Sequence, residues 1–370
     1  MTRDTLPRIN RTGRVGAVRN VDACDLLLLE SSADIRWSTG FGGSVSSLLL
    51  DPGTARGHLL VDARYVERAE AEVGAASAEV DVVAVAPQRG VDRMLADLAA
   101  GRTIGVDPHT TTLARMRRLA AVVAVTEASS PLADLRRVKS HEEIAVMELA
   151  AAIATEALLS VVSDGLAGRT EREIRSRLDA KMLELGADGP AFATIVAAGP
   201  RAARPHHEAG DDRVAADDMV IIDMGAEIGG YRSDMTRVVG VGHPDAERAG
   251  MLATVSEAQA SGVSTVRAGV VGSEVDSAVR RVLAAAGCES EFVHGTGHGV
   301  GIDIHETPVL GPRCDAVLRE GEVVTVEPGL YRVGVGGVRI EDLVVVGADG
   351  CRNLTLAPKE LSCPRSRPTT

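Results

Sequence analysis

The chain has 370 residues, of which 45% are hydrophobic, so it is long enough for roughly two domains with buried cores. Aromatic residues make up only 2% of the chain, which argues against a stacking platform for single-stranded nucleic acid. The formal net charge of −12 argues against nucleic acid and anionic membranes as partners, because both are bound by clustered lysine and arginine.

The first residues do not resemble an export signal. Residues 1–16 contain charges but no apolar segment, and the most conspicuous apolar run, Leu26–Leu29, is far shorter than the ~20 residues that cross a bilayer. The five cysteines are scattered and form no C-x-x-C pair, which indicates reduced thiols. We therefore expect a cytoplasmic protein without a membrane span.

Residues 21–128 alternate short apolar runs with helix-forming segments. The runs are DLLLLE, SSLLLD, HLLVDA, VDVVAVA, RTIGVD and AVVAVT, and a helical segment such as residues 63–73 lies between them. Strands that alternate with helices are typical of an α/β domain. We expect this N-terminal domain to span residues 1–134.

A junction rich in charge follows Pro131 and leads into a second domain, expected over residues 135–370. Ser140 and Glu143 form a capping-box pattern, and apolar residues then recur at steps of three and four. This pattern predicts a long amphipathic helix at the start of the second domain.

The second domain contains an internal repeat. Thr170-x-x-Glu173 and Ser273-x-x-Asp276 each resemble a helix cap, and the helices that follow each end at a glycine, Gly186 and Gly287. Each helix leads into a pair of apolar runs typical of a β-hairpin. We expect two helix-helix-hairpin halves, related by a pseudo-two-fold axis, whose hairpins face one cleft.

Four acidic residues occupy these two hairpins. Asp223 and Asp234 flank the turn at residues 228–230, and they face each other if the loop is formed by Ile228 and Gly229. Glu327 and Glu341 lie on the two sides of a glycine-rich turn at residues 334–337.

A single acid at a strand end is usually exposed or salt-bridged, but four buried carboxylates require cations. Two divalent ions would neutralise them, and an oxygen-rich ligand set suits Mn²⁺ better than a thiolate zinc site.

The stretch EFVHGTGHGVGIDIHETP, residues 291–308, can supply an imidazole ligand. It contains neither H-E-x-x-H nor G-x-G-x-x-G, so it fits neither a zincin nor a dinucleotide loop. A lone histidine in an apolar run is usually a packed core residue, but His298 lies between glycines that allow close approach of backbone to a ligand.

These residues resemble those of the pita-bread metallopeptidases. The order IDMG, SDMTR, GTGHGVG, TVEPG and VRIED matches the five-ligand dinuclear site, and DIRWSTGFGGSVSSLLLD is similar to the creatinase-type N-domain of Xaa-Pro dipeptidases (prolidases) and aminopeptidases P. The resemblance implies a creatinase-type α/β N-terminal domain and an α+β pita-bread catalytic domain.

The resemblance also implies a role for each matching residue. The metal ligands would be Asp223, Asp234, His298, Glu327 and Glu341, with Asp234 and Glu341 bridging two divalent ions, either Mn²⁺ or, in its place, Co²⁺ or Zn²⁺. Glu327 would also relay a proton, His206 and His305 would contact the substrate, and Arg339 would support a ligand carboxylate. His207 has no role in the motif, and the default for His294 is structural.

The implied function is hydrolysis of Xaa-Pro bonds in short peptides by a metal-bridging hydroxide, carried out by a homodimer. Val309 follows Pro308 where archaeal-type prolidases often have an arginine for the dipeptide carboxylate. An aminopeptidase P-like activity on longer peptides, or a broader dipeptidase, therefore stays open. The complete ligand set opposes two further functions of this fold, a metal-free creatinase and a catalytically silent binding module.

Overall fold

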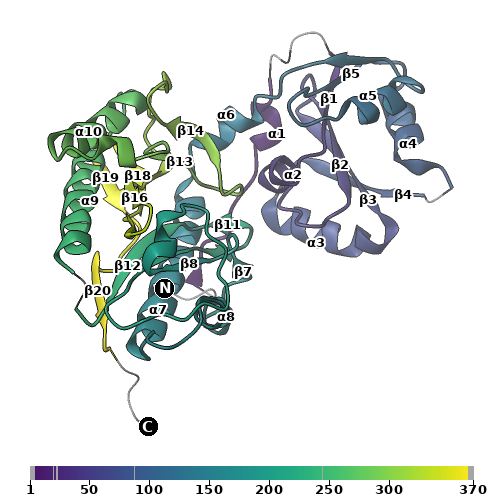
Figure 1. The fold of residues 1–370 in the computed structure, drawn as a ribbon. Coiled ribbons are helices and arrows are strands. Elements are labelled where there is room, and N and C mark those ends of the chain that lie inside the picture. Colours follow the sequence, from purple (N-terminus) through teal and green to yellow (C-terminus); the bar gives the residue numbers. More distant parts are fainter. Residues whose placement is uncertain (1–4, 20, 22–23, 87, 244, 366–370) are drawn as a thin grey trace. The chain divides into compact units, whose positions relative to one another are not determined.

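The computed structural model describes residues 5–19, 21, 24–86, 88–243 and 245–365 (Figure 1). The chain forms two compact units, Pro7–Arg136 and a second unit that comprises Arg137 onward together with Thr5 and Leu6. The bounds expected from the sequence, 1–134 and 135–370, stay a prediction, and their ends at residues 1–4 and 366–370 lie outside the described part.

The first unit is an α/β domain around one six-stranded sheet with the order β4-β3-β2-β1-β5-β6. Strand β2 is antiparallel to both neighbours, and the other pairs are parallel. All six predicted apolar runs are strands of this sheet, which confirms the expected class. The strands are β1 (Leu26–Leu29), β2 (Ser46–Asp51), β3 (Arg56–Asp62), β4 (Val80–Val85), β5 (Ile104–Val106) and β6 (Val125–Glu127).

Helices cover the sheet of the first unit, and its core is aliphatic. Every residue of β1 is buried, as expected for a strand with both faces covered. Leu28 and Leu60 of the sheet cluster with Leu95 and Leu119 of two helices. These helices are α1 (Arg14–Ala17), α2 (Ser32–Thr39), α3 (Val66–Ala76), α4 (Gly90–Ala99) and α5 (Leu113–Ala120), and α6 (Leu132–Arg137) follows at the end of the unit.

The second unit is an α+β domain in which the element order repeats (Figure 1). Helices α7 (His141–Ser163) and α8 (Glu171–Glu184) precede a hairpin of β9 (Met219–Met224) and β12 (Met235–Val241). Helices α9 (Ala246–Thr265) and α10 (Gly272–Ala285) precede a hairpin of β15 (Val323–Val326) and β18 (Asp342–Val346). The expected duplicated unit is thus confirmed in its order of elements.

The two hairpins belong to different sheets, with the orders β20-β12-β9-β8 and β14-β13-β15-β18-β19. Each hairpin continues beyond a break into a second short ladder, β10 with β11 in the first half and β16 with β17 in the second. The remaining strands are β7 (Gly189–Pro190), β8 (Ile195–Ala198), β10 (Ala226–Ile228), β11 (Tyr231–Arg232), β13 (Gly297–Gly299), β14 (Glu306–Leu310), β16 (Gly329–Arg332), β17 (Gly336–Arg339), β19 (Cys351–Asn353) and β20 (Glu360–Cys363).

The local helix signals are mostly confirmed. Capping boxes start α7 at Ser140 and α8 at Thr170, and Gly186 and Gly287 follow their helices with φ of 100° and 73°. The cap predicted at Ser273 is wrong, because the N-cap of α10 is Val271, whose N–H donates to Glu274. Hydrogen bonds from the N–H groups of Gly272 and Ser273 to a neighbouring loop hold this earlier start.

The predicted register of the first hairpin is also wrong. Asp223 lies opposite Thr236, and the loop is Gly229-Gly230. Both glycines have positive φ, 58° and 83°, which a tight primed turn requires and Ile228 would resist. Because the shift is by two residues, Asp223 and Asp234 still share one face of the hairpin.

The second turn comprises residues 333–335, and not 334–337 as expected from its glycines. Gly336 and Gly337 pair with Arg332 and Tyr331 as part of β17. A Cβ on Gly337 would lie 2.0 Å from the carbonyl oxygen of Ala202. The glycine is therefore required for close packing rather than for turning.

Helix α7 is long and apolar enough to cross a membrane by length and composition, a property that the sequence patterns above did not predict. It is the one such helix among the described residues, and 67% of its apolar window is buried inside the protein. It packs on α8, β10 and β11, and side chains such as Leu158 are fully buried. A mostly buried core helix has the same length and composition, so these two properties of α7 are only weak evidence that it spans a membrane.

We expect Leu158→Ala to lower the free energy of unfolding by about 2–5 kcal/mol, because it leaves a cavity in this core. The control is Leu183→Ala on α8, where the leucine is 52% exposed and the expected change is within about 0.5 kcal/mol. Urea unfolding followed by far-ultraviolet circular dichroism measures both. Equal small effects would contradict the core assignment of α7.

Candidate metal centre

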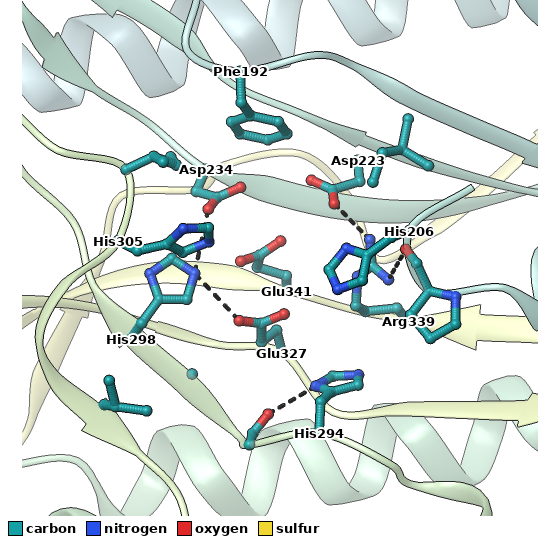
Figure 2. A pocket seen from close by; sticks show the side chains of 16 residues that line it. Phe192, His206, Asp223, Asp234, His294, His298, His305, Glu327, Arg339 and Glu341 are labelled. Atoms are coloured by element: carbon teal, nitrogen blue, oxygen red, sulfur yellow. Dashed lines mark hydrogen bonds and ion pairs between the residues drawn. The ribbon is translucent and has the colours of Figure 1, made fainter. Parts of the chain in front are cut away.

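A pocket of about 370 Å³ lies within the second unit and receives side chains from both halves of the repeat. It brings together all eight residues singled out in the sequence, which are His206, Asp223, Asp234, His298, His305, Glu327, Arg339 and Glu341. Figure 2 shows the carboxylates converging on its centre, with His298 and His305 on one side and His206 and Arg339 on the other.

The acids lie where the pairing of each hairpin is interrupted. Asp223 is near the end of β9, and Asp234 lies between β11 and β12. Glu327 follows β15 directly, and Glu341 immediately precedes β18. The two hairpins are joined at this point, because the N–H of Glu341 donates to the carbonyl of Thr236 over 3.1 Å.

His298 faces the acids with a lone pair. Its Nδ1 lies 3.0 Å from the carbonyl oxygen of Gly299, which can only accept, so Nδ1 carries the proton. Burial lowers the pKa of the ring to about 4, so the ring is neutral at pH 7 and Nε2 is unprotonated. Nε2 is 3.4 Å from Glu327 Oε1 and 3.7 Å from Asp234 Oδ2. Acceptors that face one another at these distances need either a proton on a carboxyl or a metal ion among them.

The raised pKa values of the four carboxyls also indicate that the pocket has too little positive charge for all of them to be ionised. Burial and the neighbouring carboxylates raise the pKa of Asp234 and of Glu341 well above the ordinary values. Burial raises the pKa of Glu327 to about 7, and the pKa of Asp223 is raised by burial although Arg339 opposes the shift. These groups can be fully ionised together at neutral pH only when further positive charge is added.

Arg339 is the one permanent cation among the described residues that line the pocket. Its Nη2 lies 2.5 Å from Asp223 Oδ2, its Nε donates to Thr236 Oγ1 over 3.0 Å, and its Nη1 donates to the Tyr331 hydroxyl over 2.9 Å. The Thr236 hydroxyl donates in turn to Glu341 over 2.7 Å. The guanidinium of Arg339 thus orients Asp223 directly and Glu341 through Thr236. Its single positive charge cannot neutralise four carboxylates.

The pocket also uses residues that the sequence patterns did not single out. The Thr325 hydroxyl accepts from the His298 N–H and lies 3.3 Å from Glu327 Oε1. Tyr331 links Arg339 to His294 Nε2 over 2.9 Å. Thr325 lies within the TVEPG segment, two residues before Glu327, so the sequence could have indicated that it belongs to the site. No feature of the sequence near Tyr331 indicates that Tyr331 does.

The other histidines differ in their surroundings. The His305 ring meets the His298 ring edge to face, with 4.4 Å between centroids. His294 lines the pocket, but its nitrogens are engaged by the Gly295 carbonyl and the Tyr331 hydroxyl, and burial lowers its pKa to about 4. His207 donates away from the pocket to Glu171 over 2.7 Å.

Divalent metal ions fit this set of side chains. Ligand atoms of Asp234, His298 and Glu341 lie within 4.8 Å of one another. Asp223 Oδ1 is buried and has no hydrogen-bond partner within the described part of the chain, so it is free to bind an ion. Carboxylate oxygens with one imidazole suit first-row divalent ions.

Comparison with known proteins gives two family matches. Residues 145–348 match Metallopeptidase family M24, and residues 11–138 match the Creatinase/Prolidase N-terminal domain. An Xaa-Pro dipeptidase from Pyrococcus furiosus is 40% identical over 228 residues, which are 62% of this chain and 66% of the relative.

Two solved structures are similar over most of the chain. An Xaa-Pro dipeptidase from Bacillus anthracis has a TM-score of 0.86 and 34% identity, and the match covers 92% of this chain and 95% of that one. An X-Pro aminopeptidase from Thermotoga maritima has a TM-score of 0.84 and 33% identity, covering 92% and 97%.

The raised carboxyl pKa values predict how pH affects the metal-free protein. Between the ordinary pKa of 4.5 and about 7, folded Glu327 holds a proton that the unfolded state has lost, so its contribution to the free energy of unfolding falls as pH rises. The lowered pKa values of His294 and His298 act in the opposite direction below about pH 6.5, so the effect of Glu327 is read from thermal unfolding of the wild type and Glu327→Gln in EDTA at pH 5.5 and 7.5. Over this interval the wild type should lose more stability, or gain less, than Glu327→Gln, and an equal change in both would contradict the raised pKa of Glu327.

Asp234→Asn removes one of the repelling charges and one ligand. We expect it to stabilise the metal-free protein at pH 7.5 and to lose the stabilisation by added metal, which for the wild type is about 2.7 kcal/mol at 100 times the dissociation constant. Glu257→Gln at an exposed position of α9 is the charge-matched control and should change neither. A less stable metal-free Asp234→Asn protein would be inconsistent with charge repulsion at this site.

Proposed function

We propose a function for this chain, which belongs to Metallopeptidase family M24 and has a Creatinase/Prolidase N-terminal domain: it hydrolyses Xaa-Pro dipeptides with two divalent metal ions. The observation that carries the proposal is the convergence of four carboxylates and the unprotonated Nε2 of His298 on a pocket with a single guanidinium. The relatives that are called Xaa-Pro dipeptidases support dipeptides as the substrate over longer peptides.

The proposed ligands divide between two ions. Asp223 would bind one ion, His298 and Glu327 the other, and Asp234 and Glu341 would bridge both. The free Oδ1 of Asp223 and the unprotonated Nε2 of His298 leave both groups able to bind an ion, and the proximity of His298 to Asp234 and Glu341 supports an ion shared by these three. The mostly oxygen ligands favour Mn²⁺ over Co²⁺ and Zn²⁺. When bound, the ions supply Lewis-acid activation of water and of the scissile carbonyl.

The remaining side chains would bind substrate and move protons. His206 and His305 would donate hydrogen bonds to the peptide carbonyl as negative charge develops on its oxygen. Glu327 would accept a proton from the attacking water and deliver it to the leaving nitrogen. Arg339 would keep Asp223 and, through Thr236, Glu341 in position.

The apolar wall of the pocket fits a proline ring. Phe192, Ile195, Ile304 and Val309 line it, and Figure 2 shows Phe192 facing the carboxylates. A prolyl nitrogen in a peptide bond carries no N–H, so the pocket need not provide an acceptor at that position.

A homodimer in the cytoplasm and a domain boundary between residues 134 and 135 complete the proposal. The five cysteines are free, which agrees with a reducing compartment. Support for the homodimer and for the boundary comes from the resemblance in sequence.

One assay tests the proposed activity. Protein treated with EDTA and then supplied with Mn²⁺, Co²⁺ or Zn²⁺ should cleave Xaa-Pro dipeptides faster than Xaa-Pro-Yaa tripeptides and much faster than Xaa-Ala. The rates are read from release of the free amino acid or dipeptide that follows the first residue. Cleavage of Xaa-Ala as fast as Xaa-Pro would rule out proline specificity, and faster cleavage of tripeptides would favour the aminopeptidase.

Asp234→Asn should abolish this turnover, because the bridging carboxylate is lost, whereas Glu257→Gln should retain it. Metal content per chain, measured by mass spectrometry after reconstitution, should fall for Asp234→Asn only. Activity near the wild-type level in Asp234→Asn would disprove the ligand assignment.

A further inference from the structure

Glu171 is a buried carboxylate outside the pocket with an unusual number of partners. It is the first residue of α8 and is 0% exposed. Its Oε1 accepts from the Ala198 N–H over 3.0 Å and from Arg201 Nε over 2.8 Å. Its Oε2 accepts from the Gly210 N–H over 3.2 Å and lies 2.7 Å from His207 Nε2. Each oxygen thus holds one backbone group and one side chain.

The charge on Glu171 fixes the direction of the His207 bond. Burial raises the pKa of this carboxyl, but the hydrogen bonds from Arg201, His207 and the N–H groups of Ala198 and Gly210 together outweigh burial and hold the pKa below its ordinary value. The group is therefore ionised at neutral pH and can only accept, so His207 Nε2 donates.

These contacts close the neck of a loop. The chain leaves β8 at Ala198 and returns at Gly210, and both of these residues donate to the same carboxylate. After Gly210 the chain runs beside the start of α8, where the N–H groups of Glu171 and Arg172 donate to the carbonyls of Asp212 and Gly210 over 3.0 and 2.9 Å. We call the carboxylate and its four partners the Glu171 clamp.

The loop closed by the clamp carries His206, which faces the pocket (Figure 2). The first part of the loop, the short helix Gly199–Ala203, packs against β17 so closely that Gly337 leaves no space for a Cβ. On one side of His206, the hydrogen bond from Arg339 Nη1 to the Pro205 carbonyl is long, at 3.4 Å. On the other side, His207 makes a much shorter hydrogen bond to Glu171, at 2.7 Å.

The second pocket histidine is supported in the same way. Glu306, which follows His305, pairs with Lys139 over 3.1 Å, and the two side chains are 5% and 2% exposed. Glu306 also accepts from the N–H of Asp303 over 3.2 Å. On both walls of the pocket, the residue after the histidine is held by a buried charged group.

We propose that His207 and Glu171 are positioning residues for His206, with the His207 ring anchored in the Glu171 clamp so that the adjacent imidazole is held at the peptide substrate. The inference rests on the proposed function, because the contact between His206 and substrate belongs to it. A displacement of about 1 Å at a substrate-positioning group can cost on the order of 10²-fold in rate.

A double-mutant cycle separates positioning from a general effect on stability. With Mn²⁺ and an Xaa-Pro dipeptide, His207→Ala should lower kcat/KM by about 10- to 100-fold, because a supporting hydrogen bond is lost, while bound metal per chain stays the same. His207→Gln should recover most of the activity, since its amide can still donate to Glu171. In a His206→Ala background, His207→Ala should cause less than about a twofold further loss.

The matched control is Glu322→Gln. Glu322 is also 0% exposed and pairs with Arg137 and Arg319, but it does not line the pocket. The Glu322→Gln variant should have a lower melting temperature and an unchanged kcat/KM, whereas Glu171→Gln should lower both the melting temperature and kcat/KM. A loss of activity in His207→Ala that is equally large with and without His206, or no loss at all, would overturn the proposal.

The NMR signal of the His206 ring gives a readout that does not depend on activity. Assigned by its absence in His206→Ala, this signal should shift in His207→Ala and return toward the wild-type position in His207→Gln. An unchanged signal in His207→Ala would overturn the proposal. If the wild type cleaves no Xaa-Pro dipeptide, the proposed function has failed, and the NMR signal still decides whether the clamp positions His206.

Discussion

The crowding of four carboxylates in one pocket, two of them buried and two partly buried, is the constraint on which the second unit depends. Burial raises the pKa values of Asp223, Asp234, Glu327 and Glu341, and the neighbouring carboxylates raise those of Asp234, Glu327 and Glu341 further. Arg339 offsets only part of this charge. The folded protein therefore keeps a cluster that is unfavourable without cations, and bound cations convert the same cluster into a source of stability.

The fold tolerates this cluster because rigid elements from both halves hold each acid. The hairpins contribute the acids at the interruptions of their ladders, and a backbone hydrogen bond from Glu341 to Thr236 joins the hairpins there. His298 comes from β13, a third element, where glycines flank it on both sides. Outside the pocket, the residue after each of the pocket histidines His206 and His305 contacts a buried charged side chain, Glu171 for His207 and Lys139 for Glu306. These buried charges have partners of opposite charge, whereas the carboxylates of the pocket outnumber their one guanidinium.

The features that the sequence predicted correctly are those with local signals. Leucine and valine runs predict the sheet of the first unit, and the capping boxes at Ser140 and Thr170 predict the starts of α7 and α8. Register was mispredicted because it depends on the two glycines with positive φ in the first hairpin. Thr236, Tyr331 and Glu171 were missed because their roles arise from contacts between residues far apart in the chain, such as the 36 positions that separate Glu171 from His207. The sequence patterns did not predict the apolar length of α7, a length and composition that a mostly buried core helix shares with a membrane span.

Calorimetric titration of the metal-free protein with Mn²⁺ at pH 6.5, in buffers of different ionisation enthalpy, tests whether bound cations relieve the repulsion among the four carboxylates. The experiment counts the ions bound and the protons released as they bind. With the pKa of Glu327 near 7 and those of Asp234 and Glu341 well above the ordinary values, the account predicts two ions per chain and release of at least one proton. Fewer than one ion per chain, or binding of two ions without proton release, would contradict it.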